Sequence, residues 1–250
     1  MKTGEGRLVI LSGPSCAGKS PLDKALGRLY PQLRARLQAI TLYNDRAPRP
    51  GEVDGVDYHF RTRTYIEGLR GHPRYAVMDV RGDLQALDLA ALRELLAAGD
   101  AFFEGNPFVG HALLTLPELA GFSRVSAFMS PLSGEEIRQL KEAGADLPAL
   151  LTDVMRRKLL RRTRRQKGEL SAPDLANIEK RAGSAWRELS LAHHFGGVIP
   201  NHDGEDSENW DAFYYPLGEA RRSLLAFVDL LEGRTSAWVE RWEADLVPPP

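Results

Sequence analysis

Residues 8–20 of the chain read Leu-Val-Ile-Leu-Ser-Gly-Pro-Ser-Cys-Ala-Gly-Lys-Ser. The apolar run from Leu8 to Leu11 predicts a buried strand, and apolar residues at three- and four-residue steps from Leu22 predict a helix soon afterwards. Between them lies the pattern G-x-x-x-x-G-K-[ST]. In this order the loop turns its backbone N–H groups toward an anion, and the helix adds the positive end of its dipole. The stretch therefore predicts a strand, a polyphosphate-binding loop and a helix.

The loop residues form the predicted donor-nucleotide site: Gly13, Pro14, Ser15, Cys16, Ala17, Gly18, Lys19 and Ser20. Lys19 is expected to reach the β- and γ-phosphates of ATP, and the Ser20 hydroxyl is expected to bind Mg²⁺. A glycine-rich turn in an unrelated α/β domain is the alternative for the motif taken alone. Because Cys16 is the one cysteine of the chain, no internal disulfide can form.

The composition is that of an ordinary globular protein of 250 residues, with 43% hydrophobic and 27% charged residues. Lys and Arg number 33 against 34 Asp and Glu, so no overall positive charge favours nucleic acid. No apolar run approaches the roughly 20 residues needed to cross a bilayer, and no signal sequence is recognisable before the first strand. We therefore expect a cytoplasmic protein without a membrane or nucleic-acid partner. The sequence leaves the oligomeric state open.

Strands alternate with helices along the rest of the chain. Apolar stretches predict strands over 37–43, 74–80 and 124–129, and apolar spacing predicts a helix over 87–98 that ends at Gly99. This alternation after a phosphate-binding loop predicts a three-layer α/β/α fold with a mainly parallel sheet.

A second motif occupies residues 46–60, which read Arg-Ala-Pro-Arg-Pro-Gly-Glu-Val-Asp-Gly-Val-Asp-Tyr-His-Phe. Arg46 and Arg49 place two forked guanidinium groups on a loop stiffened by proline, and such groups bind a phosphate through paired hydrogen bonds. Tyr58 can donate a third hydrogen bond to the same phosphate. A solvated charged loop is the alternative for an isolated R-x-P-R, but here the motif follows a phosphate-binding loop.

Together the two motifs resemble those of the guanylate kinase family, which joins G-P-S-x-x-G-K-S to T-R-x-P-R-x-G-E-x-x-G-x-D-Y-x-F. The family also places a helix before G-x-F-[hydrophobic]-E, and residues 92–104 end similarly in Gly-Asp-Ala-Phe-Phe-Glu. The stretch 180–201 is similar to the last helix and strand of the family, and the resemblance covers residues 7–232 in patches. It implies a P-loop fold with an acceptor-binding insertion and a helical lid. The implied reaction is phosphoryl transfer from ATP to GMP, which gives ADP and GDP.

The resemblance assigns the acceptor site residue by residue. Arg46, Arg49 and Tyr58 would hold the phosphate of GMP. Glu104 would accept hydrogen bonds from N1–H and the amino group of guanine, a role that suits a carboxylate because this edge offers two parallel donors.

The lid of the family corresponds to the basic stretch around residues 156–180. Arg162, Arg165 and Arg181 would close over the transferring phosphoryl group and act with Lys19 as catalytic residues, because phosphoryl transfer depends on positioning and charge neutralisation. A solvated helix face or a basic patch for RNA is the alternative. Aromatic residues do not interleave with these arginines, so stacking on single strands lacks support.

The resemblance also divides the chain, which we expect to form one domain over residues 1–250. The expected parts are a P-loop core over 1–40 and 113–232, an acceptor-binding segment over 41–112 with an insertion over 61–86, a lid over 156–180 and a C-terminal tail over 233–250.

Several positions depart from the family pattern. Leu42 replaces a serine that contacts guanine, and Val109-Gly110-His111 stands for a Tyr-Gly-Thr that contacts phosphate and base. The acidic strand end of the family, hydrophobic-Asp-hydrophobic-Asp-x-x-Gly, has no counterpart between residues 111 and 124. Its nearest match is 77–82, whose Asp79 either lies near Mg²⁺ or is an ordinary strand-end aspartate. Two alternatives stay open: a kinase for another phosphorylated small molecule, and a non-catalytic guanylate-kinase-like binding module.

Overall fold

The computed structural model describes residues 6–49 and 51–249, so the first five residues of the expected core and the last residue of the expected tail lie outside the described residues. The centre of the fold is a five-stranded parallel sheet in the order β2-β7-β1-β8-β9. Its strands are β1 (Leu8–Ser12), β2 (Leu37–Ala39), β7 (Asp100–Gly105), β8 (Arg124–Ser130) and β9 (Gly197–Pro200). The predicted parallel sheet is confirmed.

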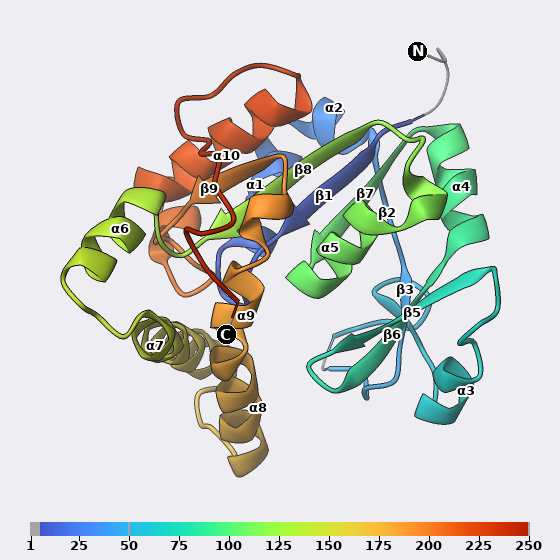
Figure 1. The fold of residues 1–250 in the computed structure, drawn as a ribbon, viewed down its shortest axis with the longest axis horizontal. Coiled ribbons are helices and arrows are strands. Elements are labelled where there is room, and N and C mark those ends of the chain that lie inside the picture. The colour runs from blue at the N-terminus through green and yellow to red at the C-terminus, as the bar shows by residue number, and fades with distance from the viewer. Residues whose placement is uncertain (1–5, 50, 250) are drawn as a thin grey trace.

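Helices cover both faces of this sheet, which confirms the three predicted layers (Figure 1). Val9 and Leu11 of β1 belong to the hydrophobic cluster of one face, and Leu8 and Ile10 belong to that of the other. This split follows because successive side chains of a strand point to opposite faces. The first cluster contains residues of α1 (Lys19–Leu29) and α10 (Gly218–Leu231), and the second contains residues of α4 (Leu89–Ala98), α5 (Pro107–Thr115), α6 (Gly134–Glu142) and α9 (Ala185–Leu189).

A second sheet of four strands has the order β4-β3-β6-β5. Its strands are β3 (Leu42–Asn44), β4 (Tyr58–Phe60), β5 (Tyr75–Val80) and β6 (Asp83–Asp88). The short helix α3 (Arg63–Glu67) packs on one face through Ile66. The stretch 37–43, predicted as one strand, forms parts of two, because the chain leaves the parallel sheet after Ala39 and enters the second sheet at Leu42. Between β1 and β2 lies the further short helix α2 (Pro31–Arg34).

Residues 61–86, expected as an insertion, are an integral part of the second sheet. They form α3 and most of the β5–β6 hairpin, which turns at Arg81 and Gly82, where φ is 58° and 85°. Positive φ at both central residues matches the twist of a two-residue hairpin turn. The hairpin was not predicted, and the helix expected from residue 87 begins at 89, where the Asp88 carboxylate accepts the N–H of Ala90 at 2.9 Å.

The acceptor-binding segment expected over 41–112 is too long. Its strand β7 pairs with β1 and β2 in the middle of the parallel sheet, so residues 89–112 belong to the core. The second sheet, with the loops that join its strands, spans only residues 42–88.

The expected lid corresponds to two helices, the C-terminal half of α7 (Leu147–Lys167) and most of α8 (Ala172–Gly183). Figure 1 shows α8 and the second sheet on opposite sides of the space below the parallel sheet. The tail packs on the core: Glu240 pairs with Val198 through a β-bridge, and Trp242 is buried. The Glu240 carboxylate also accepts the N–H of Gly134 at 2.8 Å, at the start of α6.

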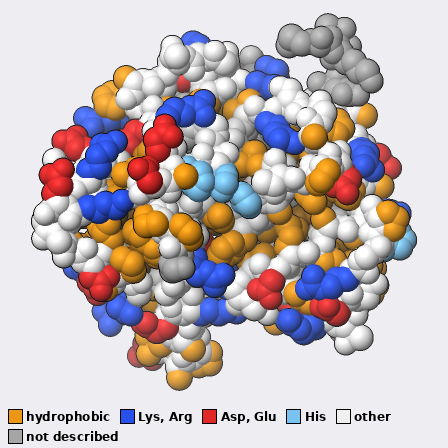
Figure 2. All heavy atoms as spheres, viewed as in Figure 1, with side chains coloured by type: hydrophobic (Ala, Val, Ile, Leu, Met, Phe, Trp, Pro, Cys, Tyr) orange, Lys and Arg blue, Asp and Glu red, His pale blue; other side chains and the backbone are white. Residues whose placement is uncertain are grey.

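The surface carries both signs of charge. On the face drawn in Figure 2, cationic and anionic side chains are interspersed, and histidines gather near the centre of the view. The ring of His194 lies close to those of His111 and His193, with centroids 4.4 and 3.8 Å apart and the ring planes tilted by 51° and 40°. Over residues 6–49 and 51–249, no helix combines the length and the apolar composition needed to cross a membrane.

Candidate active site

The loop between β1 and α1 has a conformation that requires two glycines. Gly13 and Gly18 have φ of 154° and 100°. A Cβ at Gly13 would lie 2.4 Å from the carbonyl oxygen of Met129, and a Cβ at Gly18 would lie 2.6 Å from Asn201 Nδ2. Since α1 begins at Lys19, its first backbone N–H groups lie at the end of this loop, where they favour an anion.

Lys19 and Ser20 lie in the first turn of α1. Lys19 is buried, and its Nζ donates to the carbonyl oxygens of Gly13 and Pro14 at 2.9 and 2.8 Å. Ser20 Oγ donates to Glu104, with 3.3 Å to Oε1. The ammonium therefore braces the loop, and the hydroxyl lies beside a carboxylate of the neighbouring strand.

Glu104 lies at the P-loop and not among the strands of the second sheet. Its strand β7 runs parallel to β1 with Glu104 opposite Leu11, so both strands end at the same edge of the sheet. Burial raises the pKa of Glu104, and the nearby Lys19 ammonium opposes this rise. We expected Glu104 to read guanine. Glu104 lines the cavity that also holds Arg46, Arg49 and Tyr58. Beside the P-loop serine, it is also suited to a divalent cation bound to phosphates, because carboxylate and hydroxyl oxygens are the ligands that Mg²⁺ prefers.

The second motif folds into a compact loop around Glu52. Arg46 forms a forked pair with Glu52 at 2.7 and 2.6 Å, and its guanidinium lies 5.1 Å from the ring centre of Tyr58. The backbone N–H of Arg49 donates to the same carboxylate at 2.7 Å. Burial alone would raise the pKa of Glu52, but the hydrogen bonds from Arg46 and Arg49 outweigh burial and lower it. The structure thus brings Arg46, Arg49 and Tyr58 together, and Glu52 organises them.

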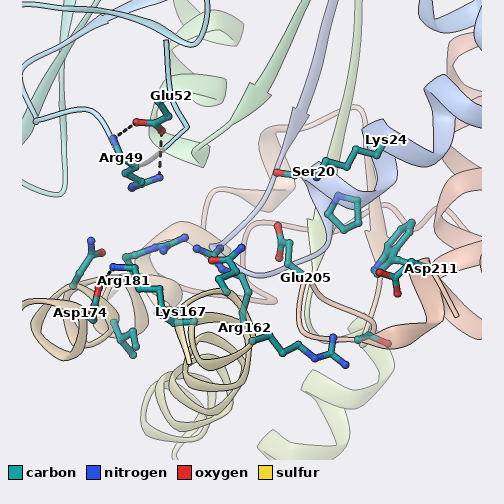
Figure 3. A pocket seen from close by; sticks show the side chains of 18 of the residues that line it. Ser20, Lys24, Arg49, Glu52, Arg162, Lys167, Asp174, Arg181, Glu205 and Asp211 are labelled. Carbon is teal, nitrogen blue, oxygen red and sulfur yellow. Dashed lines mark hydrogen bonds and ion pairs between the residues drawn. The ribbon is translucent and has the colours of Figure 1, made fainter. Parts of the chain in front are cut away.

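Two neighbouring cavities connect the motifs. One, of about 760 Å³, is lined by the P-loop, the acceptor loop and β6; the other, of about 830 Å³, is lined by α1, α7 and α8. Arg49, Arg162 and Arg181 line both cavities. Figure 3 shows these three side chains reaching toward the same space from the acceptor loop and the two lid helices.

The lid arginines carry more positive charge than their neighbours balance. Arg181 Nε donates to Ser15 Oγ at 2.9 Å, which ties α8 to the P-loop. Burial, together with the charges of Arg162 and Arg49, lowers the pKa of Arg181 to about 9. Among the described residues, the buried Nε of Arg162 has no hydrogen-bond partner. Such a cluster of cations favours the binding of a polyanion.

Arg165 differs from the other two lid arginines. It lines only the larger cavity and pairs with the exposed Glu208 at 2.6 Å. The structure therefore places Arg162 and Arg181 at the junction of the cavities, and Arg165 at the outer edge of the larger one.

The loop after β9 reaches the P-loop, which we did not expect from the sequence. Glu205 Oε2 accepts the backbone N–H of Gly18 at 3.1 Å. The next residue, Asp206, pairs with Lys158 at 3.4 Å and with Arg161 at 2.6 Å, both on α7. The acidic run that follows the last strand, Asp203-Gly-Glu-Asp206, is the signal that could have identified this contact.

Asp79 belongs to the β5–β6 hairpin. It is exposed, and its carboxylate accepts the N–H of Gly82 at 2.8 Å in the β5–β6 turn. It lines neither cavity. The ordinary strand-end aspartate, the alternative left open above, is the interpretation that fits this geometry.

Known proteins are similar to this chain in both sequence and fold. A family model described as guanylate kinase matches residues 5–69. The guanylate kinase of Cereibacter sphaeroides is 35% identical over 159 residues, which cover 61% of this chain and 71% of that protein. That of Mycobacterium sp. strain MCS is 33% identical over 206 residues, which cover 79% and 97%. The chain belongs to the guanylate kinase family.

A solved guanylate kinase also shares the fold. The crystal structure of guanylate kinase from Anaplasma phagocytophilum superposes with a TM-score of 0.51 at 17% sequence identity, covering 93% of this chain and 88% of that one. At this identity the likeness concerns the arrangement of the elements and not the chemistry of individual side chains.

Two features of the fold bear on the motifs compared above. β7 is a hydrophobic strand beside the P-loop strand β1, and the carboxylate near its end is Glu104. Val109-Gly110-His111, compared above with a Tyr-Gly-Thr, is part of α5 and lines neither cavity. A Cβ at Gly110 would lie 2.2 Å from Ser12 Oγ, so this glycine allows α5 to approach β1.

Proposed function

We propose that this member of the guanylate kinase family transfers the γ-phosphoryl group of ATP to the phosphate of GMP, giving ADP and GDP. The observation that carries the proposal is the convergence of the P-loop and the Arg46–Tyr58 loop on one cavity. A phosphate-binding loop with lysine and serine suits the donor, and a separate pair of guanidinium groups suits a second phosphorylated molecule.

The donor phosphates would bind along the P-loop and the first turn of α1. Lys19 would release the carbonyl oxygens that it now contacts and turn its ammonium to the β- and γ-phosphates. Ser20 and Glu104 would hold Mg²⁺, since their oxygens already lie 3.3 Å apart at this end of the sheet. When bound, Mg²⁺ neutralises charge on the donor phosphates.

The acceptor phosphate would bind to Arg46, Arg49 and Tyr58. Glu52 keeps Arg46 oriented through two hydrogen bonds, so little side-chain freedom is lost when the phosphate arrives. Because these residues and the P-loop line one cavity, the acceptor oxygen can approach the γ-phosphoryl group directly.

Arg162 and Arg181 would stabilise the charge that develops on the transferring group, because they line both cavities. The lowered pKa of Arg181, about 9, still leaves its guanidinium charged at neutral pH. A closing motion of α7, α8 and the second sheet would exclude water and so protect ATP from hydrolysis.

A coupled assay for ADP formation tests the proposal. Purified protein with ATP and Mg²⁺ is offered GMP, AMP, CMP, UMP and dGMP in parallel, with Lys19→Ala as the blank. Turnover with GMP supports the proposal, and its absence with every monophosphate removes it.

One observation favours a second candidate, a kinase for another phosphorylated acceptor. Leu42 and Leu87, on neighbouring strands of the second sheet, are both buried and apolar, and Ala76 packs with them. They belong to the core and line neither cavity, so Leu42 cannot take the place of a serine that contacts guanine. The same acceptor panel, extended to sugar phosphates, decides between the two. Intact Lys19, Ser20 and Glu104 argue against the non-catalytic binding module, which calorimetry with ATP and Mg²⁺ tests.

A further inference from the structure

The second sheet presents to the acceptor cavity a polar side chain, Gln85, that the reaction described above does not use. Leu84 and Ala86 of β6 pack with Ile66 of α3, whereas Gln85 and Leu87 point to the opposite face. Gln85 lines the cavity of about 760 Å³ together with Arg46, Arg49 and Tyr58.

The carboxamide of Gln85 has no hydrogen-bond partner among the described residues, although the residue is only 8% exposed. Arg49 and Tyr58, the proposed phosphate ligands, also have side chains without a short hydrogen bond, whereas four other polar side chains that the second sheet and its loops contribute to this cavity are engaged. Their contacts are Arg46 with Glu52, Asp57 with the N–H of Val53, Arg81 with Glu188, and Asp83 with Lys180. The carboxamide atoms are not among the solvent-shielded polar atoms that lack a partner, so they are open to the cavity and free to contact a ligand there.

A second amide lies directly beside it. Asn44 is the register partner of Gln85 on the adjacent strand β3, so their side chains share one face about 5 Å apart at Cβ. Asn44 is fully buried, and its Oδ1 accepts the backbone N–H of Arg46 at 3.2 Å. Its Nδ2 has no partner among the described residues. Two amides with unused donors therefore adjoin the arginine that opens the acceptor motif.

We propose that Gln85 donates a hydrogen bond to the acceptor phosphate and that Asn44 is a positioning residue for it. This inference rests on the proposed function, in which Arg46 and Arg49 hold that phosphate. A small rotation would bring Gln85 Oε1 to Asn44 Nδ2, leaving the Gln85 amino group directed into the cavity. An anion is the fitting ligand because the guanidinium groups of Arg46 and Arg49 and the phenol of Tyr58 line the same cavity. The carboxylates that the second sheet and its loops add there already have partners: Glu52 pairs with Arg46, Asp57 accepts the N–H of Val53, and Asp83 pairs with Lys180. A neutral donor orients the acceptor phosphate, and it reduces the nucleophilicity of the phosphate oxygen less than another charged donor would.

Gln85→Ala and Gln85→Glu together test this assignment in the coupled assay. Loss of one hydrogen bond is expected to raise KM for GMP about tenfold in the alanine variant, with kcat and KM for ATP within about twofold. The glutamate variant is expected to be weaker still, about 100-fold in kcat/KM, because its carboxylate repels the phosphate. Gln139→Glu, an exposed change on α6, is the matched control for charge.

Calorimetry separates a phosphate contact from a contact with the base. Gln85→Ala is expected to weaken GMP binding and to leave guanosine binding unchanged. If the glutamate variant binds GMP better than the alanine variant, Gln85 accepts from the guanine edge and the inference is overturned. Unchanged KM for GMP in Gln85→Ala overturns it as well.

Asn44→Ser tests the positioning role, since a serine hydroxyl can still accept the N–H of Arg46 while the amide donor is removed without adding a charge. It is expected to raise KM for GMP about fivefold, and to have no further effect in the Gln85→Ala background. Additive effects of the two changes overturn the positioning role. If the wild type turns over no acceptor, the proposed function itself is overturned. If the wild type turns over GMP and Gln85→Ala leaves KM unchanged, only the inference about Gln85 is overturned.

Discussion

Replacing Glu205 by alanine is expected to strengthen ATP binding. The Glu205 carboxylate accepts the backbone N–H of Gly18 at 3.1 Å, and P-loops use such N–H groups to hold donor phosphates. The carboxylate therefore occupies part of the phosphate site, and ATP has to displace it. Glu205 also lines both cavities, so its negative charge lies near the whole path of the triphosphate.

The size of the effect follows from the strength of this hydrogen bond. A hydrogen bond to a charged group contributes about 1.5–3 kcal/mol when it is well buried. Glu205 is only half-buried, so a net value of about 1.4 kcal/mol is a suitable estimate for this contact. The site is then free in about one molecule in ten, and the apparent Kd for ATP is about tenfold higher than without the contact. Glu205→Gln keeps a neutral acceptor and is expected to give an intermediate Kd.

Calorimetry with ATP and Mg²⁺, without acceptor, measures this series directly. Glu208→Gln is the matched control, because Glu208 lies in the same loop, is 78% exposed and pairs with Arg165. The reasoning is refuted if Glu205→Ala weakens ATP binding, since the carboxylate would then help to hold the nucleotide or its metal ion. It is also refuted if the control tightens binding by the same factor, because the effect would then be one of general charge.

Three further changes test other parts of the structure. Lys19→Met is expected to lower kcat by about 10³ or more, as a coupled assay with GMP measures, because its ammonium is the P-loop cation for the transferring group. Glu104→Gln is expected to lower activity and to raise the Mg²⁺ concentration needed for the half-maximal rate, while the preference for GMP over AMP stays unchanged. A changed preference would indicate that Glu104 contacts guanine. Asp100→Asn is expected to reduce the free energy of unfolding at pH 7 by about 2 kcal/mol in urea titrations, because Arg7 contacts both Asp100 oxygens. Burial alone would raise the pKa of Asp100, but the hydrogen bonds from Arg7 outweigh burial and lower it. The difference in the free energy of unfolding between wild type and variant is therefore expected to fade as the pH falls below about 4.

The donor site could be predicted from the sequence because its parts are contiguous. A buried strand, two glycines that need positive φ and a lysine at the helix start all lie within residues 8–20. The grouping of Arg46, Arg49 and Tyr58 could also be predicted, since these residues gather around Glu52 within the same motif. Local geometry brings such residues together whatever the rest of the chain does.

The β5–β6 hairpin was missed because β6 is covered on both faces. Leu84 and Ala86 pack toward α3 while Leu87 packs toward the main core, so the alternation of polar and apolar residues that marks a strand is nearly absent. With Asp88 at its end, the run reads as the start of a helix. A signal was present in Arg81-Gly82, a pair suited to a two-residue turn, between two runs of similar length.

The role of Glu104 could not be derived from any stretch of sequence. Its contact with Ser20 spans 84 positions, and it depends on β7 lying beside β1. A carboxylate at a strand end serves equally well for a base or a metal ion, so the sequence by itself does not separate the two roles.

The order of strands in the parallel sheet bears on which residues can recognise the base of the acceptor. If Glu104 serves the metal ion, the guanine edge has to be read by the second sheet. Leu42, Ala76 and Leu87 of that sheet belong to the core and line neither cavity, whereas most of the side chains that the sheet and its loops present to the smaller cavity are polar. A strong preference for GMP over AMP would then require one of these polar groups to form a hydrogen bond with the base. Measured preferences for wild type, Glu104→Gln and Gln85→Ala therefore decide which strand reads the acceptor.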